Sequence, residues 1–102
     1  MEKQLAGLDI SVDNEGYLTD LSQWTREVAE EIAEEEGIEM TDQHWKVIEY
    51  IQDSFRNQES LSMRSLGKRG PVSIKDLYAL FPDGPLKKAS KIAGIPKPAS
   101  CV

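Results

Sequence analysis

The chain has 102 residues, 39% of them hydrophobic and 29% charged, which suits one small domain with a single core over residues 1–102. Its single cysteine excludes an internal disulfide framework and a cysteine-based zinc site, and we expect no metal or cofactor. No apolar run has the length of a membrane span, and residues 1–4 lack the basic start of a secretory signal. We therefore expect a cytoplasmic protein that makes no contact with a membrane.

The net charge of −6 is divided unevenly along the chain. Residues 1–60 hold sixteen acids and four bases, whereas residues 61–102 hold two acids and eight bases. The acidic part argues against a general nucleic-acid binder. The basic part could meet an acidic partner surface or RNA, or it is simply a solvated surface.

Residues 2–20 are predicted to form a short antiparallel β-meander. Every second residue is apolar over the first part of the stretch: Leu8, Ile10 and Val12. This period of two is typical of a half-buried strand. Residues 13–16 are a turn signal, Tyr17 can begin a return strand, and residues 6–7 can form an earlier turn. Because three short strands cannot stand alone, helices must cover one of their faces.

A first amphipathic helix is predicted from a cap at Asp20 or Ser22 to about Glu36, where Gly37 stops it. Its apolar face includes Trp24, Val28 and Ile32. The opposite face is acidic, and no base or nucleophile accompanies these acids. We therefore interpret this face as solvated surface instead of a paired-carboxylate active site.

A second helix is predicted to begin after Thr41, a good N-cap. Its expected buried stripe is Trp45, Ile48, Ile51, Gln52 and Phe55, with Val47 beside it. His44 is the only histidine and cannot build a metal site alone, and no nucleophile lies near it in sequence. We interpret His44 as structural and the two tryptophans as core anchors.

Residues 60–81 resemble a helix-turn-helix. Ser60 or Ser62 can start a short helix, residues 70–71 break it, and Ser73 caps a second helix. A DNA reader of this kind offers Arg, Asn or Gln to base edges from its second helix. Here that helix offers only Lys75 and Asp76. The motif is therefore interpreted mainly as a packing device, with DNA binding kept as an alternative.

A final helix is predicted to start at Pro85 and to stop at Gly94. Residues 95–102 hold two prolines and are predicted to form a flexible, extended arm of roughly 25 Å with Cys101 near its tip. Lysines surround this thiol in sequence: Lys87, Lys88, Lys91 and Lys97. We expect these lysines to dock a partner or to stabilise the thiolate of Cys101. The nearby terminal carboxylate disfavours that thiolate because both groups are negatively charged. The active site of a partner protein would then activate the thiol, and such an arrangement suits a carrier substrate better than an enzyme.

Several motifs together resemble the DsrC/TusE family, which comprises the gamma-subunit-like partner of dissimilatory sulfite reductase and the sulfur-relay protein of tRNA 2-thiouridine synthesis. The matching stretches span nearly the whole chain: residues 13–18, Trp24, Ala33, residues 36–38, 44–45, 80–85, Ala89, residues 92–98 and 101–102. The resemblance implies an α+β fold, with a small N-terminal β-meander packed against about five helices and a mobile C-terminal arm.

The resemblance also implies that Cys101 is the family's penultimate cysteine, which accepts sulfur as a persulfide. The DsrC branch has a second cysteine eleven residues earlier, where this chain has Ser90. An intramolecular disulfide is therefore excluded, and the single cysteine favours a TusE-like sulfur carrier, with tRNA 2-thiouridine synthesis as one destination. If classed as an enzyme, it would be a sulfurtransferase.

Two alternatives stay open, a DsrC-like gamma subunit of sulfite reductase and a regulatory, DNA-binding paralogue. The expected partners are sulfur-donor and sulfur-acceptor proteins, including sulfurtransferases, a tRNA thiolase or a sulfite reductase, without direct nucleic-acid contact. Residues 63–77 look shorter than the corresponding loop of TusE-like proteins, which would change how a partner docks.

Overall fold

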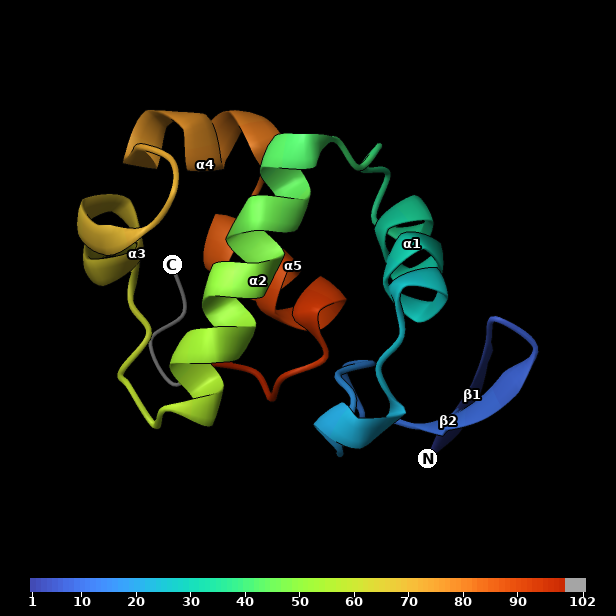
Figure 1. Cartoon of the computed structure of the whole chain (residues 1–102). Coiled ribbons are helices and arrows are strands. Elements are labelled where there is room, and N and C mark those ends of the chain that lie inside the picture. Colours follow the sequence, from blue (N-terminus) through green and yellow to red (C-terminus); the bar gives the residue numbers. More distant parts are fainter. Residues whose placement is uncertain (99–102) are drawn as a thin grey trace.

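A computed structural model describes residues 1–98 of the chain. Its elements are β1 (Glu2–Leu5), β2 (Leu8–Ser11), the 3-10 turn η1 (Leu21–Gln23), α1 (Arg26–Glu35), α2 (Asp42–Arg56), α3 (Met63–Arg69), α4 (Ile74–Leu80) and α5 (Pro85–Ala93). Helices α2 and α5 cross at the centre, with α1 and the hairpin on one side and α3 and α4 on the other (Figure 1). This arrangement confirms the predicted α+β fold.

The N-terminal sheet is a two-stranded hairpin, smaller than the predicted meander. Its turn uses Ala6 and Gly7, both with positive φ (53° and 75°), as a type I′ hairpin turn requires. The expected third strand is reduced to one isolated bridge between Val12 and Leu18. Asp13 explains the reduction, because its carboxylate accepts two backbone N–H groups of the following loop and folds that loop into a local turn.

The first helix begins later than predicted. Asp20 caps only the 3-10 turn η1, where the backbone N–H of Ser22 donates to its carboxylate (2.9 Å) and lowers the pKa of that carboxyl. Helix α1 has its own cap, Thr25, whose hydroxyl accepts from Val28 N (3.2 Å). Between the two, Trp24 is extended (φ −73°, ψ 134°), and its side chain reaches across to α5.

Helix α2 is capped at Thr41 as predicted, but its buried face is rotated. Ser54 is buried, whereas Phe55 is 40% exposed. The reason is that Val47 and Ile51 form the centre of the face covered by α5, and one further turn places Ser54 under that cover.

His44 is structural, as predicted. Its Nδ1 accepts the backbone N–H of Thr41 (3.0 Å), and its Nε2 lies 2.8 Å from the carbonyl oxygen of Leu80. Because an N–H only donates and a carbonyl only accepts, Nδ1 is the accepting nitrogen of the ring and Nε2 the donating one. Phe81 packs edge-on against the ring, with centroids 5.0 Å apart. The histidine thereby fixes the start of α2 to the end of α4.

Helices α3 and α4 form the predicted pair, capped by Ser62 and Ser73. They touch at Gly67, where an added Cβ would lie 2.1 Å from Cγ1 of Ile74. Only glycine permits this close approach.

Helix α5 begins with Pro85 at its first turn and is the most deeply buried helix. Leu86, Ala89, Ile92 and Ala93 are all fully covered. Because α5 contacts α1, α2 and α4, the position of the chain end after it is set by the whole core.

Candidate functional site

The point at which the chain leaves α5 is fixed by its own backbone. Gly94 ends the helix in the left-handed region (φ 78°), and a Cβ there would lie 2.6 Å from Cδ1 of Trp24. The next N–H, that of Ile95, donates to Ser90 O (3.2 Å). Ile95 is 2% exposed. This residue, which the sequence assigned to the arm, therefore belongs to the core, and the exposed segment begins at Pro96.

Two side chains from other elements hold the last carbonyls of α5. Trp24 Nε1 donates to Ile92 O, and Gln52 Nε2 donates to Ala93 O, each at 2.8 Å. The final carbonyls of a helix have no partner within it, so these contacts satisfy groups that would otherwise be buried and unpaired. They attach the exit of the arm to η1 and α2.

A third contact joins the arm to the turn after the hairpin. Lys97 Nζ is 2.8 Å from a carboxylate oxygen of Glu15, in the turn after the hairpin. Cys101 lies outside the described residues, so its role stays a prediction. It is three residues beyond Pro98, a span of at most about 10 Å at roughly 3.3 Å per residue.

The predicted lysines fall into two groups. Lys87, Lys88 and Lys91 line one hollow of about 220 Å³ on α5, together with Glu15, Tyr17, Glu36 and Asp83. Lys97 does not line this hollow, but it forms an ion pair with Glu15, which does.

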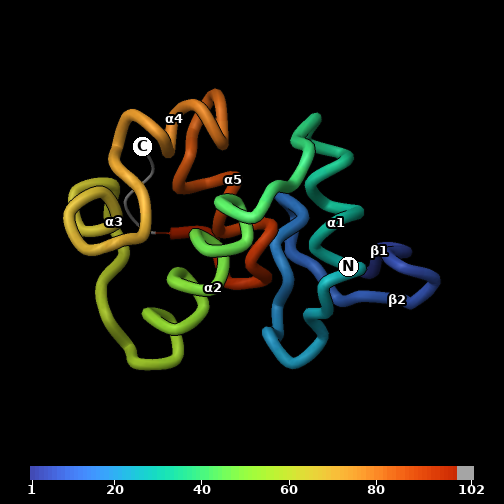
Figure 2. The backbone as a smooth tube through the Cα atoms, turned by 45° about the horizontal axis from the view of Figure 1, so that its top comes forward, coloured from blue at the N-terminus to red at the C-terminus, as the bar shows by residue number. Residues whose placement is uncertain are grey.

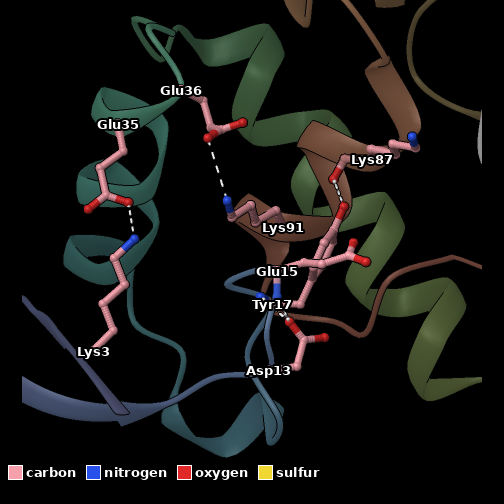
Figure 3. Close-up of polar contacts among 8 residues, drawn as sticks. All are labelled: Lys3, Asp13, Glu15, Tyr17, Glu35, Glu36, Lys87 and Lys91. Atoms are coloured by element: carbon pink, nitrogen blue, oxygen red, sulfur yellow. Dashed lines mark hydrogen bonds and ion pairs between the residues drawn. The ribbon is translucent and has the colours of Figure 1, made fainter. Parts of the chain in front are cut away.

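Figure 3 shows how this hollow is held together. Lys91 points to Glu36, with Nζ 3.5 Å from the carboxylate, and the Tyr17 hydroxyl donates to Lys87 O (3.2 Å). The carboxylates of Glu15 and Glu36 were not identified as site residues from the sequence. They offset the positive charge of Lys91 and Lys97. The only signal for them was that both lie in stretches matching the family.

Ser90 occupies the position of the second cysteine of the DsrC branch, as the resemblance implies. Its side chain is fully buried, and its hydroxyl has no hydrogen-bond partner among residues 1–98. A buried hydroxyl without a partner costs free energy. The position therefore suits a less polar side chain.

The described part of the chain holds neither a metal-binding cluster nor a membrane-spanning helix. Within residues 1–98, no three His, Cys, Asp or Glu side chains are grouped so that they could hold a metal ion. None of the helices over these residues combines the length and apolar character that a membrane span needs.

The whole chain can be compared with known proteins. The family model for "DsrC like protein" matches residues 4–102. The chain belongs to this family. The resemblance inferred from the motifs is thereby confirmed.

Among sequences of this family, the chain is similar to "Sulfurtransferase TusE" of Escherichia coli (strain K12) and of Shigella dysenteriae serotype 1. Each is 40% identical over 104 positions that cover 94% of this chain and 95% of the relative. The alignment has 104 positions, but 94% of the 102 residues of this chain is only about 96 residues. The relatives therefore have residues at some aligned positions where this chain has none. That the missing residues belong to the 63–77 segment stays a prediction.

Two solved structures share the fold over 100% of both chains. The NMR structure of DsrC from Allochromatium vinosum has a TM-score of 0.83 at 35% identity. The crystal structure of the oxidized gamma-subunit of the dissimilatory sulfite reductase (DsrC) from Archaeoglobus fulgidus has a TM-score of 0.83 at 37% identity.

Proposed function

We propose that this DsrC-like protein is a sulfur-relay carrier that takes up sulfur at Cys101 as a persulfide and passes it to an acceptor protein. The observation that carries the proposal is its 40% identity over nearly the whole chain to proteins named Sulfurtransferase TusE. The fixed exit of the arm at Gly94 supports it, because a carrier must present its thiol at a defined place on the domain.

The chemistry is a transfer of one sulfur atom without net oxidation. The thiolate of Cys101 attacks the outer sulfur of a donor persulfide, a new S–S bond forms, and the donor leaves as its thiolate. The reverse attack, by a thiolate of the acceptor on the outer sulfur at Cys101, unloads the carrier. Lys87, Lys88, Lys91 and Lys97 are proposed to favour the thiolate or to dock the partner, with Lys91 and Lys97 partly neutralised by their carboxylate partners.

Ser90 favours a relay over the gamma-subunit alternative. In the DsrC branch, as the resemblance implies, a cysteine at this position gives one chain two thiols. Here the position holds a buried serine, so sulfur on Cys101 has no second thiol of the same chain to react with. The sulfur must pass to another molecule. We infer a cytoplasmic relay with donor and acceptor proteins as partners, and tRNA 2-thiouridine synthesis as its destination.

The first test is direct loading of the purified protein. After incubation with glutathione persulfide, mass spectrometry should show a gain of one sulfur atom on the wild type and on Ser100→Ala, the matched control, but none on Cys101→Ala. A wild type that gains no sulfur contradicts the carrier function.

The destination needs a second measurement. Expressed in an Escherichia coli strain that lacks its own TusE, the wild type should restore 2-thiouridine in tRNA, and Cys101→Ala should restore none. If the wild type is loaded with sulfur but restores no 2-thiouridine, the carrier function stands and the tRNA destination is wrong.

A further inference from the structure

An apolar groove of about 460 Å³ lies where the arm leaves the domain. It runs between the end of α2, the α2–α3 connection and residues 95–98, and its apolar lining comes from Phe55, Leu61, Ile95, Pro96 and Pro98. Figure 1 shows this part of the arm passing the end of α2, and in both views it runs toward α3 (Figures 1 and 2). The groove therefore adjoins the segment that leads to Cys101.

Phe55 gives the groove an exposed aromatic ring. It is 40% exposed although it stands at a position where helical periodicity predicts burial. Large aromatic side chains left at the surface beside a hollow are typical anchors of protein interfaces.

The neighbouring helix α3 supplies positive charge. It carries Arg64, Lys68 and Arg69 and no acidic residue. None of these three bases forms an ion pair with a carboxylate of residues 1–98. They line a second hollow of about 210 Å³, which shares Ser62 with the groove.

The length of the chain beyond the groove limits where sulfur can be exchanged. Pro98 lines the groove, and Cys101 is three residues further on, at most about 10 Å away. The reactive centre of any partner must come within this distance of Pro98. A partner of ordinary interface size would then cover the groove and the nearby face of α3 as well.

We propose that the groove and the basic face of α3 together form the docking surface for the protein partner that exchanges sulfur with Cys101. The partner places an apolar side chain against Phe55 and presents acidic residues to Arg64, Lys68 and Arg69. This inference rests on the proposed relay function and adds the surface and the chemistry of the partner. Positive charges beside an apolar centre suit a protein, because an RNA backbone gains nothing from Phe55 and Leu61 and is repelled by Glu59 in the groove lining.

The test compares variants of this surface with matched variants elsewhere. Phe55→Ser removes the anchor, Phe55→Leu retains an apolar side chain, and the control Leu8→Ser changes an exposed apolar residue (53% exposed) in the hairpin. The double variant Arg64→Glu/Lys68→Glu reverses the charge of α3. Its control, Lys46→Glu/Lys75→Glu, makes the same charge change at exposed positions of α2 and α4.

Two readouts separate docking from thiol chemistry. Loading by glutathione persulfide, which needs no docking, should be the same in all variants. In Escherichia coli lacking TusE, the initial rate at which 2-thiouridine appears after induction should fall about tenfold or more for Phe55→Ser and for the α3 double variant, the loss expected of an interface anchor. Phe55→Leu should retain most of the rate, and both controls should match the wild type.

Several results would overturn the inference. Full rates in Phe55→Ser and in the α3 double variant would show that the surface is not used. An equal loss in the α2/α4 control would show a general charge effect. Salt-sensitive binding of purified tRNA that the α3 double variant abolishes would assign the basic face to RNA. A wild type that loads sulfur but restores no 2-thiouridine would show that the proteins of 2-thiouridine synthesis in Escherichia coli do not dock on this surface. A wild type that cannot be loaded would contradict the relay function itself.

Discussion

Helices α1 and α3 lie on opposite sides of the central pair α2 and α5 (Figures 1 and 2). Both are amphipathic and both are capped by a hydroxyl side chain. Their outer faces differ in charge: α1 has five glutamates and one arginine, whereas α3 has three bases and no acid.

The charges of the two helices are also used differently. Three of the five acids of α1 bond within the molecule: Glu35 pairs with Lys3, Glu31 accepts the backbone N–H of Ala6, and Glu30 lies 3.7 Å from Arg26. The bases of α3 have no such contact with residues 1–98. We infer that the acidic face serves the fold, whereas the basic face is left for a partner.

The largest effect is expected from truncating a buried side chain that holds α1 or α3 to the core. Four residues of α1 are buried, but only Met63 and Leu66 in α3. Leu66→Ala and Ile32→Ala each remove a fully covered aliphatic side chain and should each lower the free energy of unfolding by about 3 kcal/mol. Because α3 has fewer anchors, Leu66→Ala should also open α3 locally.

Native-state hydrogen exchange distinguishes these two effects. In Leu66→Ala the amides of α3 should lose more protection than those of α2, whereas Ile32→Ala should lower protection throughout the core. Equal loss in every helix of both variants would show that α3 is as firmly held as α1.

The second prediction compares two serines. Ser90 of α5 is buried, and within the described part of the chain its hydroxyl has no hydrogen-bond partner. Ser90→Ala should therefore raise the free energy of unfolding by about 1 kcal/mol and Tm by about 4–8 °C. Ser62→Ala, which removes the cap on Ser65 N of α3, should lower it by about 1 kcal/mol. Thermal denaturation measures both, and a loss of stability in Ser90→Ala would mean that its hydroxyl is satisfied after all.

The smallest effect concerns the surface charges. Glu35→Gln breaks the ion pair with Lys3 and should cost less than about 1 kcal/mol, because both side chains are partly exposed. The cost should disappear at about 1 M salt, where charges are screened over roughly 3 Å. Lys68→Gln, its counterpart on α3, should leave the free energy of unfolding unchanged in both conditions, as measured by urea denaturation. A clear loss in Lys68→Gln would show that α3's charge stabilises the fold.

Local signals explain which features could be predicted from the sequence. Thr41, Ser62, Ser73, Pro85 and Gly94 mark helix ends through contacts made within one or two turns, so they needed no tertiary information. The structural role of His44 was also predictable, because a lone histidine offers few other functions.

The errors arise where distant segments meet. Trp24 interrupts the predicted first helix because its indole bonds to α5, 68 residues away in sequence. Phe55 was expected to be buried and Ile95 to be exposed, but the structure shows the reverse. The crossing of α2 and α5 leaves the phenylalanine at the surface and covers the isoleucine.

The sequence by itself determined the family, the helix ends, the opposite charges of the two parts of the chain and the lone cysteine near its end. These are properties of composition, short-range hydrogen bonding and periodicity. Only the tertiary structure decided where the arm leaves the domain and which surface adjoins it. Those depend on Trp24 and Gln52, which bond to the last carbonyls of α5, and on Glu15, which pairs with Lys97. Such contacts exist only once the helices have packed.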